Sequence, residues 1–128
     1  MLRAHRNSKS KAEQLSKILW GIGIENHIGY DKKPFSPFTR NGWAYRYVVR
    51  IRLNAKLRIY AEFKGDWNDS KGLFEKVSIY NTNGKSMTQS NIRSAFSKMQ
   101  KIIGKIYTSA QKNEEELFTH PPYIEYTN

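Results

Sequence analysis

Apolar and polar residues alternate along residues 43–64. In the first half, every second position from Tyr45 to Leu53 is apolar, and three of the positions between them are arginines. The second half repeats the alternation from Leu57 to Phe63. A period of two is typical of strands that bury one face. Because only the short polar segment 54–56 separates the halves, they predict an antiparallel hairpin with one apolar and one arginine-rich face.

Apolar residues at helical spacing predict two helices. The first covers residues 10–22, where Ser10 and Glu13 fit a capping box, and the second covers residues 89–111 with Thr88 as its N-cap. Residues 73–81 alternate and predict a third strand. The Asn-Gly turn at residues 83–84 introduces a short fourth strand at 85–87.

The remaining segments give weaker patterns. Residues 24–41 contain prolines and phenylalanines and predict an ordered apolar loop, with a short strand at 28–30. We expect an α+β fold with an N-terminal helix, an antiparallel sheet of three or four strands, and a long C-terminal helix packed on one sheet face. This divides the chain into a basic flexible arm (1–9), a single α+β domain (10–111) and an acidic and aromatic C-terminal tail (112–128). For the tail, a frayed end is favoured over a segment that folds back against the basic body, competes with an anionic ligand or docks a partner.

The charge is strongly asymmetric. The 128-residue chain contains 22 Lys and Arg against 11 Asp and Glu, giving a net charge of +11. Residues 111–128 hold one lysine against four glutamates, a net of −3, so the preceding residues carry +14. A body this basic attracts polyanions. We therefore expect nucleic acid, either DNA or RNA, as the partner.

Composition also narrows the chemistry. The chain has no cysteine, which rules out disulfides, thiolate metal sites and thiol nucleophiles. It has no secretory signal and no apolar run of the roughly 18–20 residues that span a bilayer, so we expect a soluble, intracellular, cytoplasmic protein without membrane contact. A compact cysteine-free chain rich in Lys, Asn and Tyr also suits a viral or mobile-element product.

Candidate catalytic groups are sparse. His5, His27 and His120 lie in different segments without metal-ligand spacing, so we expect neither a metal nor a cofactor. Glu62 and Lys64 match the acid-x-Lys pair of restriction-type nucleases, but residues 44–53 on the neighbouring strand contain no acid. The sequence therefore predicts that Glu62 is a charge partner for the arginines opposite it.

The arginine-rich sheet face is the candidate binding surface. Arginine matches the geometry of phosphate, and tyrosine can stack on an unpaired base. The surface predicted to bind nucleic acid comprises Arg46, Arg50, Arg52, Arg58, Tyr60, Lys64, Lys76 and Tyr80. With the basic arm, it favours a small, non-catalytic nucleic-acid-binding protein.

Two alternatives stay open. Tyr45-Arg46, Arg58-Ile59-Tyr60 and the basic turn before the last helix resemble the RelE-type endoribonuclease toxins, over roughly residues 44–103. That resemblance implies metal-free RNA cleavage in which Arg, Lys and Tyr side chains position RNA, with candidates Arg50, Arg58, Tyr60 and Tyr80. The third possibility is an adaptor or inhibitor that binds an acidic surface of the transcription, replication or defence machinery, with residues 114–126 as a second contact.

Overall fold

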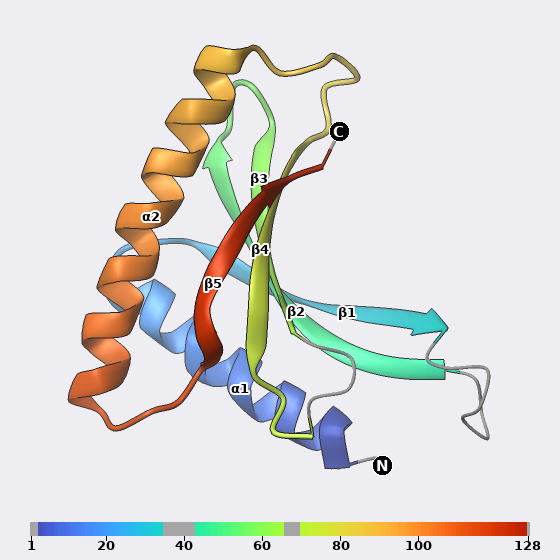
Figure 1. Ribbon diagram of the computed structural model, residues 1–128, viewed down its shortest axis with the longest axis vertical. Coiled ribbons are helices and arrows are strands. Elements are labelled where there is room, and N and C mark those ends of the chain that lie inside the picture. The colour runs from blue at the N-terminus through green and yellow to red at the C-terminus, as the bar shows by residue number, and fades with distance from the viewer. Residues whose placement is uncertain (1–2, 35–42, 66–69, 128) are drawn as a thin grey trace.

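The computed structural model describes residues 3–34, 43–65 and 70–127 and contains two helices and five strands in that part of the chain (Figure 1). In chain order the elements are α1 (Arg3–Gly21), β1 (Asn26–Pro34), β2 (Trp43–Asn54), β3 (Ile59–Gly65), β4 (Phe74–Asn81), α2 (Gln89–Lys112) and β5 (Phe118–Tyr126). The expected α+β fold, with its N-terminal helix and long C-terminal helix, is confirmed.

The strands form one mixed sheet in the order β1-β2-β3-β4-β5. The pairs β1–β2, β2–β3 and β3–β4 are antiparallel, and β5 pairs parallel with β4. The predicted hairpin is present as β2 and β3, in a register that pairs Arg50 with Glu62. The sheet has five strands and not three or four, because β1 and β5 arise from the segments that we expected to be mainly loop and tail.

Helix α1 begins earlier than its sequence signal. It starts at Arg3, so the expected capping box of Ser10 and Glu13 is wrong, and the described residues of the expected flexible arm are helical. Ser8 is buried and its hydroxyl accepts a hydrogen bond from the Tyr47 N–H at 2.8 Å. This contact ties the first turns of α1 to β2, which explains why a basic, polar start is nevertheless ordered.

One sheet face and both helices enclose the core. Val49 and Ile51 of β2, together with Phe63 of β3, pack in one cluster with apolar residues of α1 and α2. Helix α2 contributes the stripe Ala95, Met99, Ile102, Ile106 and Ala110. As predicted, Thr88 caps this helix, and its hydroxyl accepts a hydrogen bond from the Asn91 N–H. The expected strand at 85–87 is wrong, because these residues lead directly into α2.

The C-terminal tail is part of the sheet. Phe118 of β5 packs against Phe63 and Phe74, with ring centroids 6.3 and 6.2 Å apart. The register then passes from Phe74↔Phe118 to Lys76↔Tyr123, so residues 119–122 bulge from the edge. A frayed end is therefore wrong for residues 118–126, because the buried aromatic cluster holds this strand in place.

Candidate nucleic-acid interface

The outer face is the sheet face turned away from α1 and α2, and it carries most of the predicted binding residues. Its centre is an ion pair between neighbouring strands. Arg50 donates from Nε and Nη2 to the same Oε2 atom of Glu62, at 3.1 and 2.9 Å. The Glu62 side chain is 9% exposed, whereas that of Arg50 is 51% exposed. The hydrogen bond to Glu62 raises the pKa of Arg50. The prediction that Glu62 is a charge partner for an opposing arginine is confirmed.

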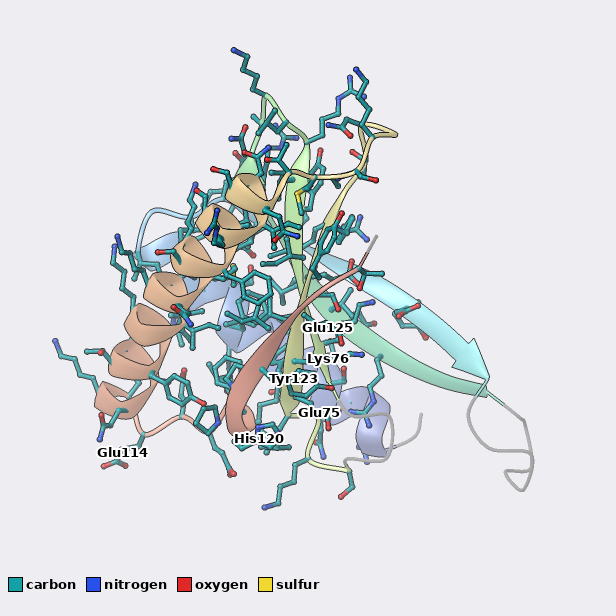
Figure 2. All side chains as sticks on the ribbon, turned by 45° about the horizontal axis from the view of Figure 1, so that its top comes forward. Glu75, Lys76, Glu114, His120, Tyr123 and Glu125 are labelled. Carbon is teal, nitrogen blue, oxygen red and sulfur yellow. The ribbon has the colours of Figure 1, made fainter. Side chains whose placement is uncertain are left out.

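A second ion pair joins β4 to β5 on the same face. Lys76 Nζ lies 3.1 Å from Glu125 Oε1, which also accepts a hydrogen bond from the Ser78 hydroxyl at 3.0 Å. Figure 2 shows Lys76 and Glu125 together where these strands run side by side. The Lys76 hydrogen bond lowers the pKa of Glu125, and the same bond raises the pKa of Lys76. Two carboxylates therefore offset part of the positive charge that the sequence indicated for this face.

The two predicted tyrosines stand beside each other. The Tyr60 and Tyr80 rings stack with centroids 5.8 Å apart, and the Arg52 guanidinium carbon lies 5.8 Å from the Tyr60 centroid. Arg52 and Tyr80 are the register partners of Tyr60 on its two neighbouring strands. Burial raises the pKa of Tyr80, and the charge of Arg50 acts in the opposite direction. Tyr60 therefore has Arg52 on one side and Tyr80 on the other.

Two of the eight predicted residues are placed differently. Arg46 is 2% exposed, and its Nη1 lies against Gly65, so it is not accessible from the surface. Arg58 lies in the turn between β2 and β3 with a φ of 53° and not in a strand. The alternation of the strands does not extend into this turn. The structure brings the other six to the outer face, Arg50, Arg52, Tyr60, Lys64, Lys76 and Tyr80.

A cleft lies beside the end of β2 that extends beyond its pairing with β1. Strand β1 starts at Asn26, opposite Ile51, but β2 continues to Asn54. The segment between α1 and β1 and the side of α2 enclose the exposed end of β2, leaving a cavity of about 590 Å³. Figure 1 shows this connecting segment passing beside α2. We call this the basic cleft, with its ionisable lining His27, Arg50, Arg52, Lys98, Lys105, Tyr60 and Glu25.

The basic cleft collects basic side chains from three elements. Arg50 and Arg52 come from β2, Lys98 and Lys105 from α2, and His27 from β1. All five are exposed, and Ile51 and Ile102 form part of an apolar floor. Lys98 Nζ donates to the Leu53 carbonyl at 2.6 Å. Leu53 lies beyond Ile51, where the pairing of β2 with β1 ends, so the lysine provides a partner for this carbonyl. Glu25 is the acid among the described lining residues, so the cleft has excess positive charge.

The basic surface continues along α2. A neighbouring hollow of about 680 Å³ is lined by Lys101, Lys105 and Lys112 with Thr108 and Ser109. Lys105 belongs to both cavities. From position 98 to position 112 the helix rises about 21 Å, roughly the rise of six base pairs of a DNA duplex. The lysines of α2 thus follow a line about as long as six base pairs of a duplex.

The lysine row of α2 is not among the eight residues that the sequence predicted to bind nucleic acid. Lys98 and Lys105 are seven residues apart and share one side of the helix. Their spacing is visible in the sequence, but their position beside Arg52 depends on how α2 crosses the sheet. His27 was missed because β1 was expected to be only a short strand.

Among the described residues, no three His, Asp or Glu side chains are grouped as metal ligands. Neither described helix has an apolar stretch long enough to cross a bilayer. Comparison with protein-family models, curated proteins and solved structures gives no match to the chain.

Proposed function

We propose that this protein binds nucleic acid through the basic cleft and the adjoining lysines of α2. The observation that carries the proposal is the convergence of Arg50, Arg52, Lys98 and Lys105 on one concave surface. Arg and Lys side chains neutralise phosphates and release condensed counterions, which provides most of the affinity in non-specific binding. The net charge of +11 supports the same partner by long-range attraction.

The arrangement of the aromatic side chains favours contacts to the backbone over stacking with bases. A base that stacks needs an uncovered ring face. Tyr60 lies between Arg52 and Tyr80, so the ring presents its edge to the surface. The cleft therefore suits a ligand recognised through its phosphates, and duplex DNA or RNA fits this mode as well as a single strand.

We favour binding over cleavage because the candidate catalytic side chains are engaged by other groups of the protein. Of the residues considered for metal-free cleavage, Arg50 and Tyr80 line one hollow with Glu62, but the polar groups of both already contact this carboxylate. Arg50 is held by Glu62, the two tyrosines are stacked on each other, and Arg58 lies in a turn. A general acid or base must reach the proton that it transfers in a plausible substrate pose. Arg52 and Lys105 of the basic cleft, by contrast, are exposed and can contact phosphates directly.

The test compares two double variants with equal loss of charge. Arg52→Ala/Lys105→Ala removes two cations of the basic cleft, and Lys85→Ala/Arg93→Ala removes two exposed cations that do not line it. We expect the first to weaken binding to labelled duplex and single-stranded oligonucleotides and to reduce the slope of log K against log salt by roughly 1.4–1.8. The second is expected to change binding much less.

Three outcomes would contradict the proposal. Equal weakening by both variants would mean that only net charge matters. Cleavage of RNA with EDTA present, seen on a denaturing gel, would favour a metal-free ribonuclease. Weak binding to every oligonucleotide together with tight binding to an acidic protein would favour the adaptor. Circular dichroism and thermal unfolding of both variants provide the folding control.

A further inference from the structure

The two edges of the sheet differ in how open they are to another strand. Natural proteins protect sheet edges with prolines, bulges or charges, because an unpaired edge can accept a strand from another chain. Strand β5 carries Pro121 and Pro122 and bulges there. Strand β1, at the other border, has Gly29 near its centre and no proline before Pro34, and its charged residues Asp31, Lys32 and Lys33 lie in its second half. Figure 1 shows β1 at the border of the sheet, extending away from α2.

Strand β1 also exposes large apolar side chains. Ile28 is 41% exposed and Tyr30 is 53% exposed. They pair with Val49 and Tyr47 of β2, which places them on the helix-facing side of the sheet, although α1 does not cover them. Trp20, 55% exposed, lies one helical turn after Ser16, whose hydroxyl donates to Asn26 at the start of β1. Apolar surface therefore gathers along this border.

We propose that the occupant of this edge is a second copy of the same chain, with the two β1 strands paired antiparallel about Gly29. In this register Ile28 of each copy faces Tyr30 of the other, on the helix-facing side. His27 of each copy faces Asp31 of the other, on the outer face. Cross-strand pairs of this kind stabilise antiparallel sheets. An imidazole can donate to a carboxylate whether or not it is protonated.

Neighbouring registers of the same pairing are less complementary. A centre at Ile28 sets Asp31 opposite Glu25, which places like charges together. A centre at Tyr30 sets Asp31 opposite Gly29 and leaves His27 without an acid. The register centred on Gly29 satisfies both the apolar and the charged pair twice, as a two-fold interface requires. Self-complementarity is what favours a second copy over an unrelated strand.

The first test measures the oligomeric state of the full chain by sedimentation equilibrium. Wild type should be in a monomer–dimer equilibrium, and Ile28→Lys should raise the dimer dissociation constant about tenfold or more, because each substitution occurs twice in the interface. Tyr123→Lys is the matched control, since Tyr123 is 48% exposed on the opposite edge strand. A wild-type protein that stays monomeric, or a dimer that only Tyr123→Lys dissociates, would overturn the proposal.

The second test reads the register directly and does not depend on how well the lysine variant folds. The chain has no cysteine, so His27→Cys/Asp31→Cys introduces the only thiols. The two positions are four residues, about 13 Å, apart along one strand, too far for an internal disulfide. Mild oxidation should convert the double variant to a covalent dimer much faster than either single variant. Equal rates for all three would contradict pairing centred on Gly29.

Discussion

At the scale of single residues, one carboxylate changes the character of the outer face. Glu62 is nearly buried and has Arg50, Lys64 and Tyr80 as neighbours, at 2.9, 3.8 and 3.5 Å. A buried carboxylate needs such partners, because desolvation penalises its charged form. Arg50 therefore has a structural task in addition to any contact with a ligand. Arg52, whose contact is with the Tyr60 ring, is the better probe of binding.

This difference gives a stability prediction. Arg50→Ala leaves Glu62 without its closest cation, and we expect a loss of about 1–2 kcal/mol in the free energy of unfolding. Arg52→Ala removes the same charge from an exposed position and should change that free energy by less than about 0.5 kcal/mol. Urea unfolding at neutral pH measures both.

The double variant Arg50→Ala/Glu62→Gln is the control for the cause. If the unpaired carboxylate is responsible, neutralising it should recover part of the stability that Arg50→Ala loses. Equal destabilisation by Arg50→Ala and Arg52→Ala would show that the ion pair contributes little.

Residue positions could be predicted from the sequence wherever the alternation continued inside a strand. Val49, Ile51 and Phe63 face the helices as predicted, because side chains of a regular strand must alternate. Arg46 obeys the alternation but is buried, which depends on what lies over that end of the sheet. The positive φ of Arg58 follows from the turn geometry between the strands. Neither fact is encoded in a local pattern.

At the scale of elements, the start of α1 depends on a tertiary contact. The Ser8 hydroxyl accepts from the Tyr47 N–H at 2.8 Å and lies 3.4 Å from the Tyr47 carbonyl. Ser8→Ala leaves this backbone N–H of β2 without that acceptor, so we expect a loss of about 1–2 kcal/mol in stability. Arg6→Ala/Lys9→Ala is the control, because both residues are exposed and in the same turns.

Thermal and urea unfolding distinguish whether residues 3–9 are a docked helix or a dispensable arm. A docked helix predicts that Ser8→Ala is destabilising and that the double charge variant is nearly neutral. If residues 3–9 were a dispensable arm, both variants would unfold like wild type.

Strand β5 gives a prediction about acid. The pKa of Glu125 is lowered, mainly by the Lys76 hydrogen bond, from an ordinary value of 4.5. A carboxyl with a depressed pKa stabilises the fold above 4.5 and loses that contribution as the pH falls through its folded pKa. The Lys76 pKa is raised, so this lysine stays charged throughout that range.

We therefore expect Glu125→Gln to be less stable than wild type at neutral pH, by about 0.5–1 kcal/mol for a partly exposed pair. The difference should disappear well below pH 4.5. Urea unfolding at the two pH values measures it. Glu116→Gln, an exposed glutamate that precedes β5, is the control and should match wild type at both. A difference that persists in acid would mean that the substituted amide disturbs packing and that the lost charge is not responsible.

The elements that the sequence predicts correctly are those with a clear local pattern of apolar residues or a clear cap. The β2–β3 hairpin has strict alternation, and α2 has both a cap and an apolar stripe. Strands β1 and β5 lack such patterns, because one contains Gly29 and the other contains Pro121 and Pro122. They are ordered by pairing with β2 and β4 respectively. Pairing with a distant strand is a tertiary effect that local propensity does not report.

At the scale of the whole molecule, the proposed dimer changes the geometry of the proposed binding site. Antiparallel pairing about Gly29 joins the two sheets into one, with both outer faces on the same side. The two His27 residues, each lining one basic cleft, then lie about 13 Å apart along the paired strands. Each cleft continues along about 21 Å of α2. A duplex long enough to cover the cleft and lysine row of both copies can contact both at once, whereas one that covers a single row contacts only one.

This yields a length-dependent prediction that rests on both proposals. Wild type should bind a duplex of about 20 base pairs ten- to a hundredfold more tightly than one of about 8, because the second contact is intramolecular. Ile28→Lys should lose most of that advantage while keeping its affinity for the short duplex. Arg52→Ala/Lys105→Ala should weaken binding at both lengths. Fluorescence anisotropy at fixed salt provides the comparison. If only the cleft variant loses binding to the short duplex and wild type binds both lengths equally, the cleft is the binding site and the dimer has no part in binding.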